Sequence, residues 1–207
     1  MASAQKDNST FRLKAKLRKK ALAFLDTPVV METHGGYGAI YQECYGKLET
    51  GIVFEKDTKK AAALGKQRPT WAVYECDCVS AIRAGVGLHL PVNLYDVDPY
   101  GSPWDVIDAI LSAKREWPAR LVFAVNDGLR QKLKMAGGWD VGALSDVCVR
   151  YGNGALYTHY LEICQEMLTE KVRQAGYGLS YWGGYYCGWL EQMTHYAAVY
   201  DRITNAA

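Results

Sequence analysis

The chain has 207 residues, of which 49% are hydrophobic and 22% charged, and this composition suits one globular domain with a sizeable core. The formal net charge is only +2, and no apolar run reaches the length of a membrane span. The six cysteines form no CxxC pair and the four histidines show no HExxH spacing, which argues against a metal site and against a disulfide scaffold. We therefore expect a cytoplasmic protein with no membrane segment and no metal.

Basic residues are concentrated between residues 12 and 20. Leu13, Leu17, Ala21 and Phe24 recur among them at helical spacing, so residues 1–26 are predicted to hold a basic amphipathic helix. Such a charged face is most often the solvated side of a packed helix, and its functional interpretation is contact with a phosphate backbone. On that second interpretation, extended to two basic residues further along the chain, the nucleic-acid contacts are Arg12, Lys14, Lys16, Arg18, Lys19, Lys20, Arg130 and Lys132.

Residues 27–207 are predicted to form a single domain that begins with alternating strands and helices. The strand patterns lie at 28–32, 51–55, 71–75, 93–97 and 120–125, and the helical patterns between them at 39–45, 58–64, 79–84 and 103–115. Alternation at this interval is typical of βαβ units, which form a parallel sheet with right-handed crossovers.

The alternation ends after the fifth strand. Residues 126–154 are rich in glycine and are predicted to be a partly helical insert, followed by a helix over 156–174. The segments 178–186 and 193–203 are rich in tyrosine, tryptophan and β-branched residues, and no long crossover separates them. The predicted fold class is therefore α/β, with a mostly parallel seven-stranded sheet that ends in an antiparallel pair of strands.

A glycine-rich turn, Thr33-His34-Gly35-Gly36-Tyr37-Gly38, follows the first predicted strand. Glycines let the backbone approach a ligand, and the helix that follows presents unpaired N–H groups. Glu55, at the end of the second strand, is placed to accept hydrogen bonds from ribose hydroxyls. Asp77, after the third strand, could accept from an adenine amino group or could simply cap the next helix. These features favour a nucleotide-like cofactor without separating NAD from S-adenosylmethionine.

The fourth strand pattern ends in Asp96-Val97-Asp98-Pro99-Tyr100-Gly101-Ser102-Pro103. Pro99 cannot donate to a ladder, so the chain should leave the sheet near Asp98, at the edge where ligands bind in open α/β sheets. The alternative is an ordinary turn, because Asp-Pro and Tyr-Gly are turn formers.

The order of these features resembles the class I S-adenosylmethionine-dependent methyltransferases, and the resemblance covers about residues 29–125. The segment from Asp96 to Pro103 is similar to the D-x-D-P-Y-G motif of tRNA guanine-N2 dimethyltransferases and to the D-P-P-Y motif of amino-methylating DNA methyltransferases. In the usual glycine motif an acid and three glycines alternate with other residues; here His34 stands at the first glycine position.

The resemblance implies a Rossmann-like methyltransferase fold, S-adenosyl-L-methionine as cofactor, and N-methylation of an exocyclic amino group on an RNA or DNA base. It implies catalytic roles for Asp98, Pro99 and Tyr100. The carboxylate and the Pro99 carbonyl would accept the two N–H bonds of the amine, while Tyr100 stacks on an unpaired or flipped base. The implied cofactor contacts are Glu32, His34, Gly35, Gly36, Gly38, Glu55, Asp77 and Asp96.

Two other functions remain open on the sequence. A NAD-dependent oxidoreductase would use the glycine turn and Glu55, but it leaves the Asp-Pro-Tyr motif without a role, and neither Tyr196 nor Tyr200 is followed by a lysine four residues later. A non-catalytic nucleic-acid-binding module would keep the basic helix and need no cofactor. The oligomeric state is not predicted.

Overall fold

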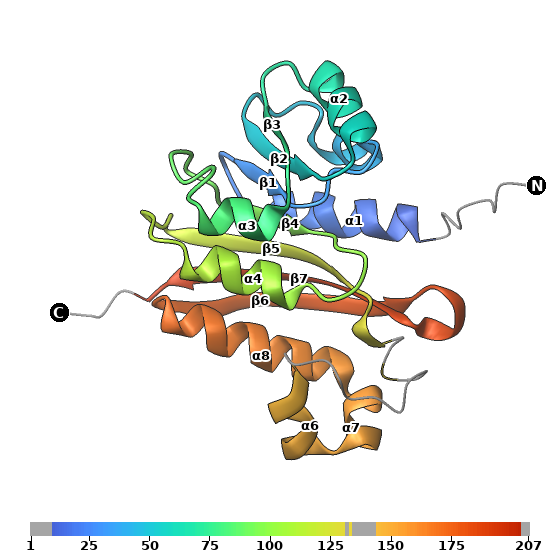
Figure 1. The fold of residues 1–207 in the computed structure, drawn as a ribbon. Helices are drawn as coiled ribbons and strands as arrows, with labels where there is room; N and C mark the ends of the chain where they lie inside the picture. Colours follow the sequence, from blue (N-terminus) through green and yellow to red (C-terminus); the bar gives the residue numbers. More distant parts are fainter. Residues whose placement is uncertain (1–9, 131–132, 134–143, 204–207) are drawn as a thin grey trace, which may run out of the picture.

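The computed structural model describes residues 10–130, 133 and 144–203, and the structural statements below concern these residues. A seven-stranded sheet with the order β3-β2-β1-β4-β5-β7-β6 runs through the molecule (Figure 1). Its strands are β1 (Val30–Glu32), β2 (Gly51–Glu55), β3 (Ala72–Glu75), β4 (Leu94–Val97), β5 (Arg120–Asp127), β6 (Tyr177–Cys187) and β7 (Met193–Arg202).

The first five strands are parallel, and β7 runs antiparallel to both of its neighbours. β1 pairs in parallel with β2 and β4, and β4 pairs in parallel with β5. β7 pairs antiparallel with both β5 and β6. The predicted fold class is therefore confirmed, and each predicted strand lies within two residues of an observed one at both ends.

Helices cover both faces of the sheet. Residues of β5 alternate between the two layers: Leu121 and Phe123 enter one core, Val122 and Ala124 the other. The first core is covered by α3 (Cys78–Arg83), α4 (Trp104–Ser112) and α8 (Tyr160–Gln174), which stand in front of the sheet in Figure 1. The second is covered by α1 (Phe11–Leu22), the π-helix η1 (Tyr41–Tyr45) and α2 (Thr58–Gln67).

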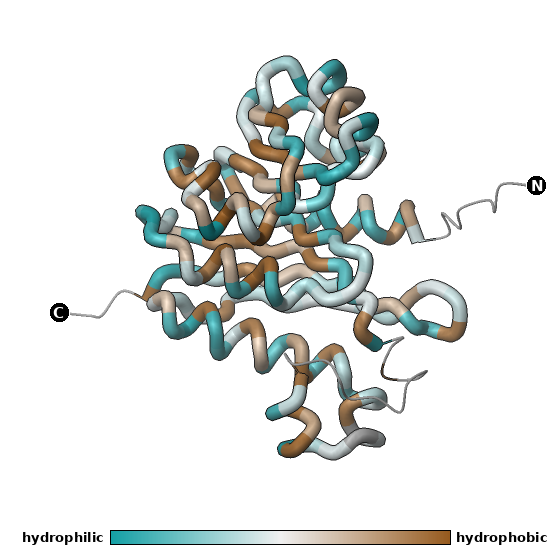
Figure 2. The backbone as a smooth tube through the Cα atoms, viewed as in Figure 1, coloured by the Kyte–Doolittle hydropathy of each residue, from teal (hydrophilic) through white to brown (hydrophobic). Residues whose placement is uncertain are grey.

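Apolar residues dominate the central strand β5, which is mostly brown in Figure 2. Every residue of β4 is buried, and only Arg120 at the start of β5 is exposed. Burial on both faces explains why β5 is a continuous apolar run over residues 121–125, whereas β4 includes the buried, ion-paired Asp96. No helix among the described residues combines the length and the apolar character needed to cross a membrane.

The helix α1 packs on β5, β7 and η1, so it is built into the domain. Its buried face differs from the predicted one. Leu13 is 43% exposed, whereas Ala15, Leu17, Arg18 and Ala21 are buried. Arg18 can lie on this buried face because it pairs with acidic side chains on the sheet. A prediction from the spacing of apolar residues does not anticipate a buried ion pair.

The segment after β5 also departs from expectation. The strand extends through Asp127, so Asn126 and Asp127 belong to the sheet and not to the predicted insert. Residues 131–132 and 134–143 lie outside the described part of the chain. The predicted helix over 156–174 is two helices, α7 (Asn153–Thr158) and α8, because His159 leaves the helical conformation between them. Another helix, α6 (Ser145–Tyr151), precedes them, and the 3-10 helix η3 (Trp189–Glu191) lies between β6 and β7.

Candidate active site

The Asp-Pro-Tyr segment leaves the sheet where it was predicted to leave. Asp98 directly follows β4, whose neighbours are β1 and β5. Tyr100 is fully exposed. The N–H of Gly128, just after β5, donates to the carbonyl of Gly101 over 2.9 Å and ties the loop to the next strand. An acid and a free aromatic ring therefore lie together at the carboxyl edge of the sheet.

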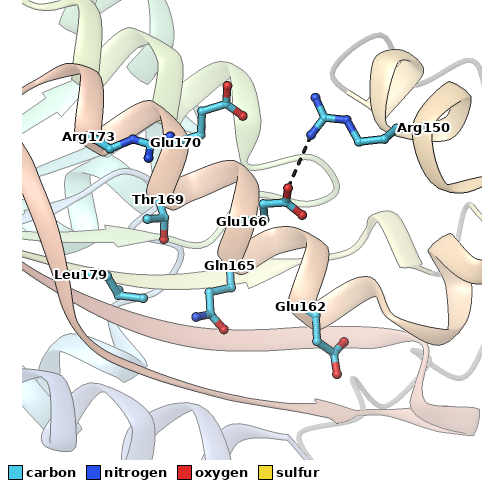
Figure 3. Close-up of a pocket in the computed structure, with 8 residues that line it drawn as sticks. All are labelled: Arg150, Glu162, Gln165, Glu166, Thr169, Glu170, Arg173 and Leu179. Carbon is cyan, nitrogen blue, oxygen red and sulfur yellow. Dashed lines mark hydrogen bonds and ion pairs between the residues drawn. The ribbon is translucent and has the colours of Figure 1, made fainter.

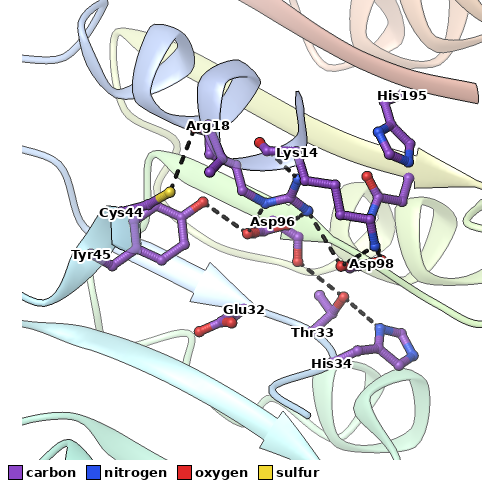
Figure 4. Close-up of polar contacts among 12 residues, drawn as sticks. Lys14, Arg18, Glu32, Thr33, His34, Cys44, Tyr45, Asp96, Asp98 and His195 are labelled. Carbon is purple, nitrogen blue, oxygen red and sulfur yellow. Dashed lines mark hydrogen bonds and ion pairs between the residues drawn. The ribbon is translucent and has the colours of Figure 1, made fainter. Parts of the chain in front are cut away.

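Asp96 and Asp98 meet two cations from α1 (Figure 4). Arg18 donates from Nε and Nη2 to the two oxygens of Asp96 over 2.7 and 2.5 Å, and the Tyr45 hydroxyl donates to Asp96 Oδ2 over 2.8 Å. Lys14 Nζ lies 3.1 Å from both oxygens of Asp98. Arg18 Nη2 also lies 3.6 Å from Asp98 Oδ2. Asp96 and Asp98 are two residues apart in an extended segment, and Lys14 and Arg18 are four apart on a helix, so each pair projects from one face. The two acids therefore meet the two cations directly.

The cluster keeps Asp98 ionised. Burial by itself would raise the pKa of Asp98, but the positive charges of Arg18 and Lys14 and the Asn126 amide lower it further than burial raises it, so the pKa lies below its usual range. The pKa of Arg18 is raised above its usual value because Asp96 and Asp98 outweigh the effect of its burial. The site therefore pairs two acidic side chains with two basic ones.

These contacts bear on three predicted roles. Arg18 was predicted to contact phosphate, but it is fully buried and committed to Asp96. Lys14 was assigned to the same surface; it lies on Asp98 with 19% of its side chain exposed, and its contact with phosphate stays a prediction. Asp96 was predicted to contact the cofactor; it is 1% exposed and its carboxylate is taken by Arg18 and Tyr45. Its role is to hold α1 on the sheet.

The glycine turn is linked to the end of β2. Gly35 N–H donates to the Phe54 carbonyl over 3.0 Å, and Gly36 N–H donates to Glu55 Oε2 over 2.8 Å. A Cβ on Gly35 would lie 2.5 Å from Leu64 and Val53 side chains, so the turn packs too closely for any other residue there.

The outer side of this turn is open. Gly36 has a φ of +55°, and a Cβ there would meet nothing within 4 Å. Glu55 is half-buried, with one oxygen on Gly36 and the other on the Asp57 N–H. A free backbone surface beside a carboxylate at the end of the second strand is a donor and acceptor set that fits an adenosine ribose.

His34, at the first glycine position, joins three elements. Its Nδ1 lies 2.9 Å from the hydroxyl of Thr33, which donates to the Asp96 carbonyl over 3.1 Å. Its Nε2 lies 3.8 Å from the Cys78 thiol at the start of α3. Burial lowers the pKa of His34 below its usual value despite the nearby carboxylates. The imidazole is therefore neutral, and its contacts link the end of β1 to β4 and α3.

Two further acids serve the fold. Glu32 is buried and ion-paired with the equally buried Arg68, so no carboxylate oxygen faces solvent at the end of β1. Asp77 caps α3 by accepting the Ser80 N–H over 2.8 Å, which is the capping interpretation. The ion pair with Lys56 and this cap lower the pKa of Asp77 to about 2. Contact of Asp77 with an adenine stays a prediction, because its side chain is 36% exposed.

Two residues at the site escaped the sequence analysis. Asn126, near the end of β5, is 1% exposed and donates from Nδ2 to Asp98 Oδ1. Among the described residues its own Oδ1 has no hydrogen-bond partner. His195 stands opposite Asn126 in the β5–β7 register, 3.5 Å from the Cys187 thiol, and burial lowers its pKa to about 3. The sequence feature that could have pointed to Asn126 is its place at the end of the fifth predicted strand, next to the strand that ends before Asp98.

Of the two later basic residues, the structure describes only Arg130. Arg130 was predicted to bind phosphate, but it is 6% exposed, lies between the Tyr157 and Tyr186 rings and donates to the Glu191 carbonyl. It is a structural residue that holds the β6–β7 connection. Lys132 lies outside the described residues.

Two open grooves lie on the surface. One, of about 620 Å³, runs between α6, α8 and β6 and carries both signs of charge, with Arg150 Nη1 3.4 Å from Glu166 Oε1 (Figure 3). The other, of about 470 Å³, lies along α1 and is lined by Phe11, Arg12, Ala15, Lys16, Lys19 and Glu43. The second groove alone borders the helix that reaches Asp98, and its lining includes three cations.

No protein-family model matches the chain, and no curated protein matches it in sequence. Among solved structures it is similar to Trm1 from Pyrococcus horikoshii in complex with S-adenosyl-L-methionine, with a TM-score of 0.61 and 12% identity over 92% of this chain and 55% of that one. It therefore spans about half the length of that protein. It is also similar to the N-methyltransferase NodS from Bradyrhizobium japonicum WM9 (TM-score 0.58, 13% identity, 96% of this chain and 100% of that one). A third is TYW2 from M. jannaschii in complex with AdoMet (TM-score 0.58, 14% identity, 97% and 79% of the two chains).

The sheet itself separates this fold from dinucleotide-binding ones. A dinucleotide-binding Rossmann sheet has the order 3-2-1-4-5-6 with parallel strands. Here the antiparallel β7 is inserted between β5 and β6. Together with the solved structures, this order identifies the architecture as the Rossmann-like fold of class I S-adenosylmethionine-dependent methyltransferases.

Proposed function

We propose that the protein is an S-adenosylmethionine-dependent N-methyltransferase that acts on an exocyclic amino group of a nucleic-acid base. The observation that carries the proposal is the placement of Asp98, an ionised carboxylate at the carboxyl end of β4, two residues before the fully exposed ring of Tyr100. In a fold of this class that edge faces the ligand.

Such an amino group is a weak nucleophile because its lone pair is delocalised into the ring. Asp98 and the Pro99 carbonyl would each accept one N–H, which turns the lone pair toward the methyl group. The buried Asn126 Oδ1, which has no partner among the described residues, is a further acceptor beside Asp98. Tyr100 would stack on a base that is single-stranded or flipped out of a helix, an interaction of roughly 1–3 kcal/mol.

The chain's own residues provide the place for the cofactor. Glu55 would accept the ribose hydroxyls, and Gly36 would let the backbone approach the ligand. Bound S-adenosylmethionine would supply a methyl group already activated by its sulfonium. Asp98 would orient the amine toward that methyl group and would take up the proton that the amine loses on methylation. The task of the protein is mostly orientation, which supplies roughly 7–11 kcal/mol in favourable cases.

The groove along α1 would provide the nucleic-acid surface. Its exposed cations are Arg12, Lys16 and Lys19. Lys19 is ion-paired with Glu43, which leaves Arg12 and Lys16 for phosphate. These side chains, one helical turn apart, would follow a phosphate backbone while a base reaches Asp98.

Methylation with labelled S-adenosylmethionine tests the proposal. Mixed tRNA, rRNA and DNA are incubated with the protein and digested to nucleosides. The expected product carries the label on an exocyclic nitrogen. Label on carbon or oxygen, or on none of the three substrates, would overturn it.

A ligand series in a thermal unfolding assay separates the alternatives. S-adenosylhomocysteine should raise the melting temperature, since a ligand that binds only the folded state stabilises it. Stabilisation by NAD instead would indicate the oxidoreductase, and stabilisation by neither compound would favour the binding module.

A further inference from the structure

Lys14 is bonded to the Asp98 carboxylate, which the proposed reaction needs as an acceptor. Its ammonium lies 3.1 Å from each oxygen of Asp98, and Asn126 donates to Oδ1 as well. A carboxylate offers about four lone-pair positions, of which these donors use three. The contact is therefore more than a surface ion pair: it caps the acceptor of the site.

The charge balance of the cluster means that Lys14 and a positively charged amine cannot both be paired with Asp98. Asp96 and Asp98 balance Arg18 and Lys14, so the four groups carry no net charge. Methyl transfer would place a further positive charge on the amine beside Asp98. One carboxylate cannot neutralise both that charge and Lys14, because two cations would then face each other across a few ångströms in a half-buried site.

Of the two cations, only Lys14 can leave. Arg18 is fully buried and held on two atoms by Asp96. Lys14 is 19% exposed at the start of α1 and has a flexible stem. Arg12 and Lys16 lie two positions away on either side and so occupy the opposite face of the helix. The phosphate that would offer Lys14 an alternative anion is therefore the one carried by the nucleotide whose base enters at Asp98.

We infer that Lys14 is a specificity-determining residue that caps Asp98 in the free protein and passes to a phosphate of the substrate when a base enters. This inference rests on the proposed function. It predicts that a base attached to a phosphate backbone is methylated well, and that the same base as a free nucleoside is methylated poorly, because the nucleoside cannot draw Lys14 away.

The test compares Lys14→Met with Lys16→Met, the same change of charge on an exposed neighbour. Substrates are a mixture of the four nucleosides and a single-stranded oligonucleotide pool of equal base composition. Lys14→Met should raise the nucleoside rate and lower the oligonucleotide rate, so that the preference for oligonucleotide falls by about tenfold or more. Lys16→Met should lower only the oligonucleotide rate. An equal fall of both rates in Lys14→Met would overturn the inference and leave the proposed function intact.

A second readout needs no turnover. Reductive methylation with a ¹³C label gives each lysine an NMR signal, and Lys14→Arg identifies the signal of Lys14. Adding the oligonucleotide pool should shift that signal, whereas adding the nucleosides should leave it in place. A signal that does not respond to the oligonucleotide contradicts the exchange even if the protein methylates nothing. If nothing is methylated but the signal shifts, the proposed function fails while the contact of Lys14 with phosphate stands.

Discussion

Arg18 and Asp96 form a two-pronged ion pair in which neither side chain exposes more than 1% of its surface, joining α1 to the middle of the sheet. Removing one partner of such a pair leaves a buried charge uncompensated, which typically costs about 3–5 kcal/mol. Arg18→Met should therefore lower the free energy of unfolding by an amount of that order.

Urea denaturation measures this change. Lys16→Met, on the exposed side of the same helix, is the control and should stay within about 0.5 kcal/mol of the wild type. The double variant Arg18→Met with Asp96→Asn should recover part of the loss, because the carboxylate charge is gone as well. A single variant as stable as the wild type would mean that the pair does not anchor α1.

Glu55→Ala should weaken the binding of S-adenosylmethionine by about 1.5–3 kcal/mol, the range for losing a charged hydrogen-bond partner. Titration calorimetry measures the affinity. Glu75→Ala is the matched control, since Glu75 stands beside Glu55 in the β2–β3 register but is exposed at the sheet's outer strand. Equal affinities in the wild type and in folded Glu55→Ala would exclude Glu55 as the ribose acid.

In the double variant Arg12→Gln with Lys16→Gln, the affinity for a single-stranded oligonucleotide should fall less steeply as the salt concentration rises. Each lost phosphate contact removes about 0.7 from the slope of log K against log [salt]. Fluorescence anisotropy at several salt concentrations gives the slope. The double variant Lys59→Gln with Lys66→Gln, on α2, makes the same change of charge away from this groove. If the Arg12→Gln, Lys16→Gln variant behaves like it, the groove along α1 does not belong to the nucleic-acid surface.

The raised pKa of the buried Asp127 leads us to expect that this group makes the protein less stable as the pH rises. Burial raises its pKa to about 7, although Leu129 N–H and the Tyr160 hydroxyl donate to it. The unfolded carboxyl has a pKa of about 3.9, so between about pH 4 and pH 7 the folded protein binds the extra proton. Stability from this group is present at the acid end of the window and is lost as the pH rises through it, by about 1.4 kcal/mol per unit of difference.

Asp127→Asn should remove this slope, which urea unfolding at a series of pH values measures. Asp26→Asn, at an exposed carboxylate, should keep it. If Asp127→Asn retains the slope of the wild type, Asp127 is ionised in the folded protein at neutral pH.

The sequence predicts most of the sheet because its signals are local. Strands such as β2 and β5 are short apolar runs bounded by turn residues, and Pro99 ends β4 wherever the rest of the chain lies. The caps are local too, as Asp77 and α3 illustrate.

The partners of the site residues are not local. Arg18 and Asp96 lie 78 positions apart, and Lys14 and Asp98 lie 84 apart. The run of basic residues on α1 therefore looks uniform in the sequence, although the fold buries Arg18, places Lys14 on Asp98 and leaves the other four exposed. Asn126 was missed for the same reason, because only the pairing of β4 with β5 brings it to Asp98.

Single-turnover methyl transfer by Asp98→Asn tests the central claim most directly, after binding of S-adenosylhomocysteine has been shown to be unchanged. Loss of the acceptor charge should slow the step by on the order of 10²–10⁴. Tyr100→Ala, which loses only stacking, should mainly weaken substrate binding and leave the rate at saturation nearly intact. An Asp98→Asn variant that transfers methyl groups at the wild-type rate would contradict amine methylation at this carboxylate.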